Sequence, residues 1–174
     1  MKTRHFLLIG IVLSVSDAFS QIETPPRRPF NVAVFSGLGG TNVTPIPALD
    51  IRYRGTTLRL APGYQYEGLG IIQEIIPLSK AFYNAYWIVS GYYFQGTLNI
   101  HDNVETTYSS YALLTGVKYY MGRHFFTELQ LGTVYTDENT VGFTEKDRFA
   151  PYFEFGIGFN IFRNFPKEIL EEED

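Results

Sequence analysis

Residues 152–162, YFEFGIGFNIF, decide the fold of this chain. Every second residue from Phe153 to Ile161 is large and apolar, while the residues between them are Glu154, two glycines and an asparagine. Strict alternation is typical of a β-strand whose two faces meet different surroundings. A strand at the surface of a soluble sandwich carries a charged outer face. Here the second face is small and almost uncharged, which indicates a narrow barrel interior behind an apolar exterior.

Seven other segments alternate in the same way between clusters of Gly, Asn, Asp and Pro. We predict strands over residues 30–38, 48–54, 57–66, 69–78, 85–98, 109–121 and 125–136. Most approach the about 9–11 residues that a tilted strand needs to cross a bilayer. The sequence therefore predicts an all-β fold, an eight-stranded antiparallel up-and-down transmembrane β-barrel. The segments 69–78 and 85–98 are apolar on both faces, so their inward faces stay open.

The N-terminal residues are typical of an export signal. Lys2 and Arg4 precede a short apolar stretch, and Ala18 and Ser20 place small residues before Gln21. We expect residues 1–20 to be a cleavable signal peptide, 21–28 an extended lead-in, 29–162 the barrel domain and 163–174 an acidic periplasmic tail. This organisation predicts a location in the cell outer membrane, with both chain ends in the periplasm because the strand number is even.

Composition narrows the possible partners. The formal net charge of −4 argues against nucleic-acid binding, which needs a basic surface, so no nucleic acid is expected as a partner. The chain has no cysteine, so it has neither disulfides nor thiolate metal sites. Aromatic residues make up 17% of it and suit the interfacial girdle of a membrane barrel. We predict such a girdle near the strand ends, and its candidate residues are Tyr53, Tyr64, Tyr66, Tyr119 and Tyr135. Trp87 could join them, but the sequence leaves open which face of its strand it lies on.

The inward positions predict an interior charge network. An eight-stranded barrel is just wide enough for its own side chains to fill it. The alternation places three acids and three bases inside, and buried charges are costly unless they are paired. The predicted network consists of Asp50, Arg52, Arg59, Lys118, Glu128 and Glu154. The alternative for these residues is a proton or ion path through the lumen.

With these features the chain resembles the small eight-stranded outer-membrane β-barrel family, which includes the membrane domain of outer membrane protein A and the X-type barrels. The resemblance covers roughly residues 29–162, and the signal-peptide junction looks Bacteroidetes-like. Its sharpest motif lies in the last strand and resembles the signal read by the barrel-assembly machinery: Glu154, Gly156, Phe159 and Ile161. In the family this motif often ends the chain, whereas twelve residues follow Phe162 here. The resemblance implies that this machinery and outer-membrane lipid are partners.

For function, the sequence predicts a non-enzymatic membrane scaffold or surface-binding protein, monomeric, with no cofactor and no metal, whose extracellular loops contact an unknown partner. The first alternative is an enzyme that modifies lipid A in the outer leaflet, with His101, Asp102 and a nearby serine, Ser109 or Ser110, as the candidate cluster. The second is a soluble, lipocalin-like periplasmic carrier, which would turn its apolar faces inward. Passive permeation of solutes is a further possibility and requires an open lumen.

Overall fold

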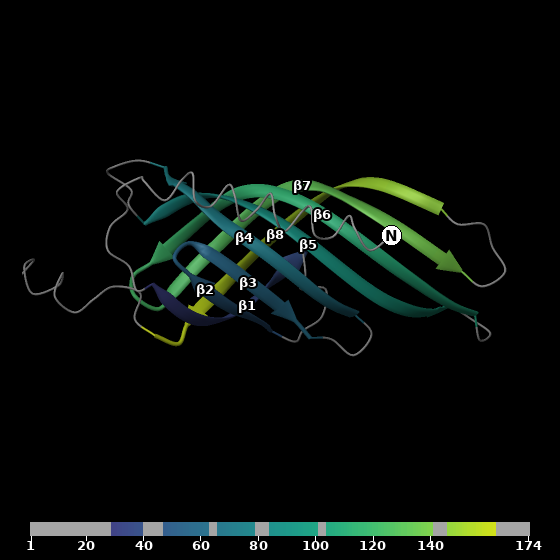
Figure 1. The fold of residues 1–174 in the computed structure, drawn as a ribbon, viewed down its shortest axis with the longest axis horizontal. Coiled ribbons are helices and arrows are strands. Elements are labelled where there is room, and N and C mark those ends of the chain that lie inside the picture. The colour runs from purple at the N-terminus through teal and green to yellow at the C-terminus, as the bar shows by residue number, and fades with distance from the viewer. Residues whose placement is uncertain are drawn as a thin grey trace, which may run out of the picture.

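The computed structural model describes residues 29–39, 47–62, 66–78, 84–100, 104–140 and 146–162. These residues form eight antiparallel strands in one closed barrel, in which each strand pairs with its neighbours in sequence and β8 pairs back with β1 (Figure 1). The strands are β1 (Phe30–Gly39), β2 (Ala48–Tyr53), β3 (Thr56–Ala61), β4 (Tyr66–Pro77), β5 (Ala85–Ile100), β6 (Val104–Met121), β7 (Phe125–Thr140) and β8 (Lys146–Asn160). The predicted all-β, up-and-down barrel is confirmed. Within the described ranges, no helix is long and apolar enough to span a membrane.

The last strand has the alternation that its sequence predicts. Phe153 and Ile157 on β8 are 54% and 50% exposed on the outer surface, whereas Glu154 between them is fully buried. Gly156, Gly158 and Asn160 continue the inward face. The barrel is therefore apolar outside and holds polar groups inside, along this strand and its neighbours.

Glycines on the inward face make room for aromatic rings on the adjacent strand. Gly158 on β8 is paired directly with Phe126 on β7, and a Cβ atom at Gly158 would lie 2.0 Å from that ring. Gly70 on β4 and Tyr92 on β5 repeat the arrangement, with a Cβ atom 2.2 Å from the ring. A ring laid over a glycine of the next strand fills the interior and fixes the register of the pair.

The two ends of the barrel differ. One end, here called the turn end, contains the tight turns Arg54-Gly55 and Gly122–His124. The start of β1 and the end of β8 lie at this end as well. At the opposite end, the loop end, β5 to β8 extend well past β1 to β4, as Figure 1 shows. The long ladders of β5–β6 and β6–β7 continue as far as Ile100↔Val104 and Thr106↔Thr140.

The structure shortens one predicted strand, extends the last three further toward the loop end than predicted, and resolves two strands that the sequence left open. The strand predicted over 57–66 ends at Ala61, and Tyr66 begins β4 instead. On β5, Tyr86, Ile88 and Tyr92 face inward, while Trp87 is exposed outside. On β4 Ile72 faces inward, and a register shift follows between Glu74 and Ile76. The predicted signal peptide (1–20), lead-in (21–28) and tail (163–174) lie outside the described residues.

Candidate functional site: an ion-pair network inside the barrel

Strand register brings the interior charges together. Asp50 on β2 is paired directly with Arg59 on β3, and Lys118 on β6 is paired directly with Glu128 on β7. Gln130, two residues beyond Glu128 on the same face, is paired with Glu154 on β8. Directly paired residues on one face of a sheet have Cβ atoms about 5 Å apart. These pairings therefore place the charged side chains next to one another on the inner face of the barrel.

Arg59 is the centre of the network. Its Nε and Nη2 donate to the two carboxylate oxygens of Asp50, each at 2.8 Å. Nη2 also donates to Oε2 of Glu128 at 2.9 Å, and Nη1 donates to Glu154. The guanidinium lies 3.5 Å from the ring centroid of Phe35, which covers its face. One fully buried arginine thus joins three carboxylates through the forked donors that only this side chain has.

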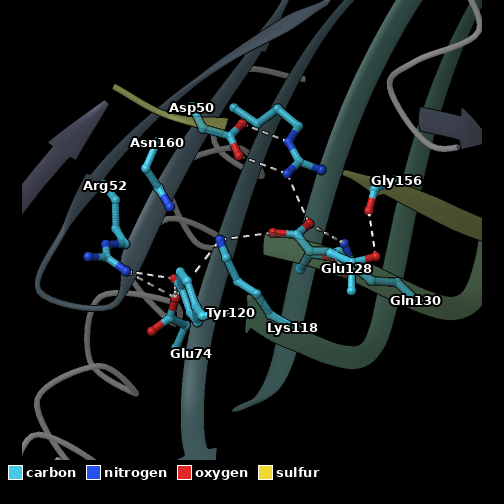
Figure 2. Close-up of polar contacts among 12 residues, drawn as sticks. Asp50, Arg52, Glu74, Lys118, Tyr120, Glu128, Gln130, Gly156 and Asn160 are labelled. Carbon is cyan, nitrogen blue, oxygen red and sulfur yellow. Dashed lines mark hydrogen bonds and ion pairs between the residues drawn. The ribbon is translucent and has the colours of Figure 1, made fainter. Parts of the chain in front are cut away.

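Lys118 extends the network to a second arginine. Its Nζ lies 2.9 Å from Oε1 of Glu128 and 3.9 Å from Oε1 of Glu74 (Figure 2). Arg52 lies beyond Glu74, 3.7 Å from the same oxygen. The Tyr120 hydroxyl links the last two, since it accepts from Arg52 at 2.6 Å and donates to Glu74. Charged and polar groups therefore form a continuous chain from β2 to β8 through the middle of the barrel.

All six residues predicted for the interior network are buried. Ion pairs join five of them directly, and the sixth, Arg52, is linked to Lys118 through Glu74. Glu74 itself was missed. It lies on β4, whose inward face the sequence left open, directly before the register shift. Among the described residues, the network with Glu74 holds four acids and three bases, one acid more than the three and three expected from the sequence. The alternation of β4 up to Ile72 would have placed Glu74 inward, had the register been known.

Neutral groups complete the network on its loop-end side. Gln130 donates from Nε2 to the Tyr92 hydroxyl at 2.9 Å, and it accepts from Ser90. The Tyr92 hydroxyl lies 3.3 Å from Oε1 of Glu154. None of these three was predicted as a site residue; Ser90 and Tyr92 lie on β5, whose inward face the sequence leaves open. Hydrogen-bonded neutral partners lower the cost of keeping ionised groups away from water.

The residues of the predicted assembly signal divide between the two faces of β8. Glu154 and Gly156 face inward, and Phe159 is exposed outside, as is Ile161 directly after the strand. Glu154 is therefore also a member of the ion-pair network. His101 and Asp102 lie outside the described residues. Ser110 faces inward, and its hydroxyl lies 2.9 Å from that of Thr136.

Comparisons with protein-family models, curated proteins and solved structures find no match for this chain. The fold and the site together define its class, a closed eight-stranded antiparallel β-barrel with many apolar side chains exposed on its surface and with acidic and basic side chains paired inside. Such a network stabilises one strand register against all others, because a slip by one residue would turn every charge to the outer surface.

Proposed function

We propose that the chain is an outer-membrane β-barrel that acts without catalysis, as a membrane scaffold or as a surface-binding protein through its extracellular loops. The observation that carries the proposal is the outer surface. Apolar side chains cover it on every strand, from Phe30 and Leu49 to Leu131 and Phe153. Exposed apolar patches larger than a few hundred Å² are rare on soluble monomers. A hydrocarbon layer is the surrounding in which such a surface is stable.

The dimensions agree with the proposal. On β7 the outward residues from Phe125 to Tyr135 are mainly apolar, and at 3.3 Å per residue and about 40° tilt they span about 25 Å. That is about the height of the apolar band of an outer-membrane barrel. Aromatic residues lie at both limits. Phe125 contacts Phe159 at one limit, with ring centroids 5.3 Å apart, and Tyr135 contacts Phe149 at the other, at 4.9 Å.

The same surface argues against the soluble carrier. A carrier of an apolar ligand turns its charges toward water, whereas the described strands bury Arg59, Lys118 and Glu128 and expose many large apolar side chains outside. The proposal includes export by the signal peptide and recognition of Glu154, Gly156, Phe159 and Ile161 by the barrel-assembly machinery. Tyr53, Tyr119 and Trp87, all exposed, fit the aromatic girdle; the side chains of Tyr64 and Tyr66 lie outside those described.

Cell fractionation combined with a heat-modifiability gel tests the proposal. We expect the protein in the detergent-extracted outer membrane, with unboiled samples migrating differently from boiled ones. Recovery in the soluble periplasmic fraction would overturn it. A His101→Ala variant tests the absence of catalysis, because it should leave the lipid A composition unchanged by mass spectrometry. Loss of one lipid A species in that variant would show an enzyme instead.

A further inference from the structure

The apolar belt on the outer surface has unequal heights on opposite sides of the barrel. Strand length is the first sign, since β2 and β3 have 6 residues each whereas β6 and β7 have 18 and 16. Because β2 and β3 lie four strands away from β6 and β7 in an eight-stranded ring, the short and long strands stand on opposite walls.

The strand tilt follows from the register. A row of paired residues that runs perpendicular to the strands passes from Phe30 through Tyr53, Thr56, Gln73, Val89, Thr115, Leu131 and Phe153. It returns to β1 just beyond Gly39, the partner of Glu154. A return about ten residues above the start, in an eight-stranded barrel, corresponds to a tilt of about 40° and an axial rise of about 2.5 Å per residue.

With this rise the belt can be measured on each wall from the turn end. On β2 the described outward apolar residues run from Tyr53 to Leu49, about 10 Å along the axis. On β7 they run from Phe125 to Tyr135, about 25 Å. The same row geometry places Tyr53 and Phe125 within about 1 Å of one height. Among the described residues the belt is therefore wedge-shaped, low on the wall of β2 and β3 (the short wall) and high on the wall of β6 to β8 (the tall wall).

At the loop end of the tall wall, the outer surface changes from aromatic to polar within one step of the alternation. Tyr93, Tyr111, Tyr135 and Phe149 are paired directly across β5, β6, β7 and β8, and they form one unbroken aromatic row on the outer surface. Phe149 is 77% exposed. One step further toward the loop end, the outward positions are polar, namely Gln95, Ser109 and Asp137. Tyrosine and its aromatic neighbours at such a change of polarity are typical of a membrane–water interface.

The described part of the short wall is mainly apolar. Its outward side chains include no charged group and are Leu49, Ile51, Tyr53, Thr56, Leu58 and Leu60. Toward the turn end of β3 the surface already becomes polar, where the Thr56 hydroxyl donates to Gln73 at 2.6 Å. A surface without charge suits lipid chains better than a protein partner, whose interface has a polar rim.

We propose that the short wall binds a locally thinned bilayer, so that the hydrocarbon layer beside β2 and β3 is thinner than the layer beside β6 to β8. The proposal rests on the membrane location proposed above. A bilayer adapts to a short apolar surface by thinning, at a cost of fractions of a kcal/mol per Å of mismatch. The lipid ring around this barrel is then asymmetric, and the short wall prefers lipids with short or disordered acyl chains.

Two single-cysteine variants test the thinning, because the chain has no cysteine of its own. Leu49→Cys on β2 and Leu129→Cys on β7 replace the same residue type at exposed sites, each four positions from the turn-end aromatic of its strand. Each variant carries a nitroxide label in dioleoyl phosphatidylcholine vesicles, and its folding is checked by migration on an unboiled gel. The readout is the depth of the label in the bilayer. It is measured as the ratio of two relaxation effects on the nitroxide, one by oxygen, which is enriched in the hydrocarbon layer, and one by a water-soluble nickel chelate.

We expect the oxygen-to-nickel ratio to be several-fold higher at position 129 than at position 49, although both labels stand at the same height on the barrel. In dilauroyl phosphatidylcholine, whose bilayer is thinner throughout, the difference should shrink. Equal, deep readings at both positions in dioleoyl vesicles would overturn the thinning and leave the membrane location intact. A label at position 49 that neither reagent reaches would show a protein neighbour instead of lipid. Water-like readings at both positions would overturn the membrane location itself.

Discussion

Arg59 is the residue on which the interior depends most. It is fully buried and pairs with Asp50, Glu128 and Glu154 at once. Arg59→Met keeps much of the side-chain volume and removes the charge, so three carboxylates lose their principal partner. We expect a loss of stability of about 3–5 kcal/mol, as for other broken buried pairs. The midpoint of urea unfolding in detergent or vesicles, followed by gel migration, measures it.

The matched control is Arg54→Met, the same chemical change on an exposed turn. Surface substitutions of this kind change stability by about 0.5 kcal/mol or less. Arg59→Lys keeps the positive charge but lacks the forked guanidinium donors, so its stability should lie between those of Arg59→Met and Arg54→Met. The ammonium group cannot satisfy both oxygens of Asp50 and two further carboxylates with the same geometry. If Arg59→Met and Arg54→Met unfold at the same urea concentration, the network does not stabilise the barrel.

Arg54 carries local backbone strain. Its φ is 55° and that of Gly55 is 132°, so both residues of the β2–β3 turn have positive φ. Two-residue hairpin turns of this kind favour Asn-Gly, since Asn tolerates the left-handed region better than other side chains. Arg54→Asn should therefore raise stability by up to about 1 kcal/mol, read from the same urea midpoint. Arg54→Gln removes the charge without relieving the backbone, and a gain of equal size in that variant would trace the effect to charge instead.

At the scale of the strands, the pairing of Gly158 with Phe126 locks β8 to β7. A methyl group at Gly158 would lie 2.0 Å from the ring of Phe126, so Gly158→Ala has to push the ring out of its place over Lys118. We expect a loss of about 1–3 kcal/mol, the usual cost of overpacking a filled interior. The double variant Gly158→Ala with Phe126→Leu should recover part of this loss. Additive losses in the double variant would show that the two residues do not interact.

The inward face could be predicted from the sequence for strands with one apolar face, but not for strands with two apolar faces. In β8 the large residues alternate with Glu, Gly and Asn, so burial on one side follows directly. In β4 and β5 the inward residues Ile72 and Ile88 are as apolar as the outward Leu69 and Trp87, because an interior aromatic and aliphatic layer looks the same in sequence as a lipid-facing one.

The predicted strand over 57–66 failed for a related reason. Tyr64 and Tyr66 continue the alternation of Leu58 and Leu60 in the sequence, yet β3 ends at Ala61, directly before Pro62. Alternation does not by itself mark the end of a strand, and Pro62, which has no backbone N–H to donate to a ladder, is the better indicator. Glu74 was lost from the predicted site through the same uncertainty, since its position depends on the register of β4 against β5.

At the scale of the whole molecule, the described interior side chains pack against one another at three levels along the barrel. At the level of Arg59, the ring of Phe35 lies against the guanidinium and three carboxylates surround it. On the turn-end side, Phe126 and Tyr120 pack together with ring centroids 5.8 Å apart, and on the loop-end side Tyr92 stacks on Phe94 at 6.0 Å. An eight-stranded barrel is just wide enough for its own side chains to fill it, so we expect these layers to close the lumen.

Purified protein in liposomes should therefore admit neither glucose nor potassium chloride, and swelling should equal that of protein-free vesicles. A general porin in the same preparation supplies the positive control, and an unboiled gel shows that the barrel is folded. Swelling at a porin-like rate would mean that the plug opens in the membrane, and the interior charges would then line a path. Under the proposed function, a closed lumen leaves the loop end, where β5 to β8 extend furthest, as the expected surface for contact with partners. Loops on a rigid scaffold are where such barrels vary their binding.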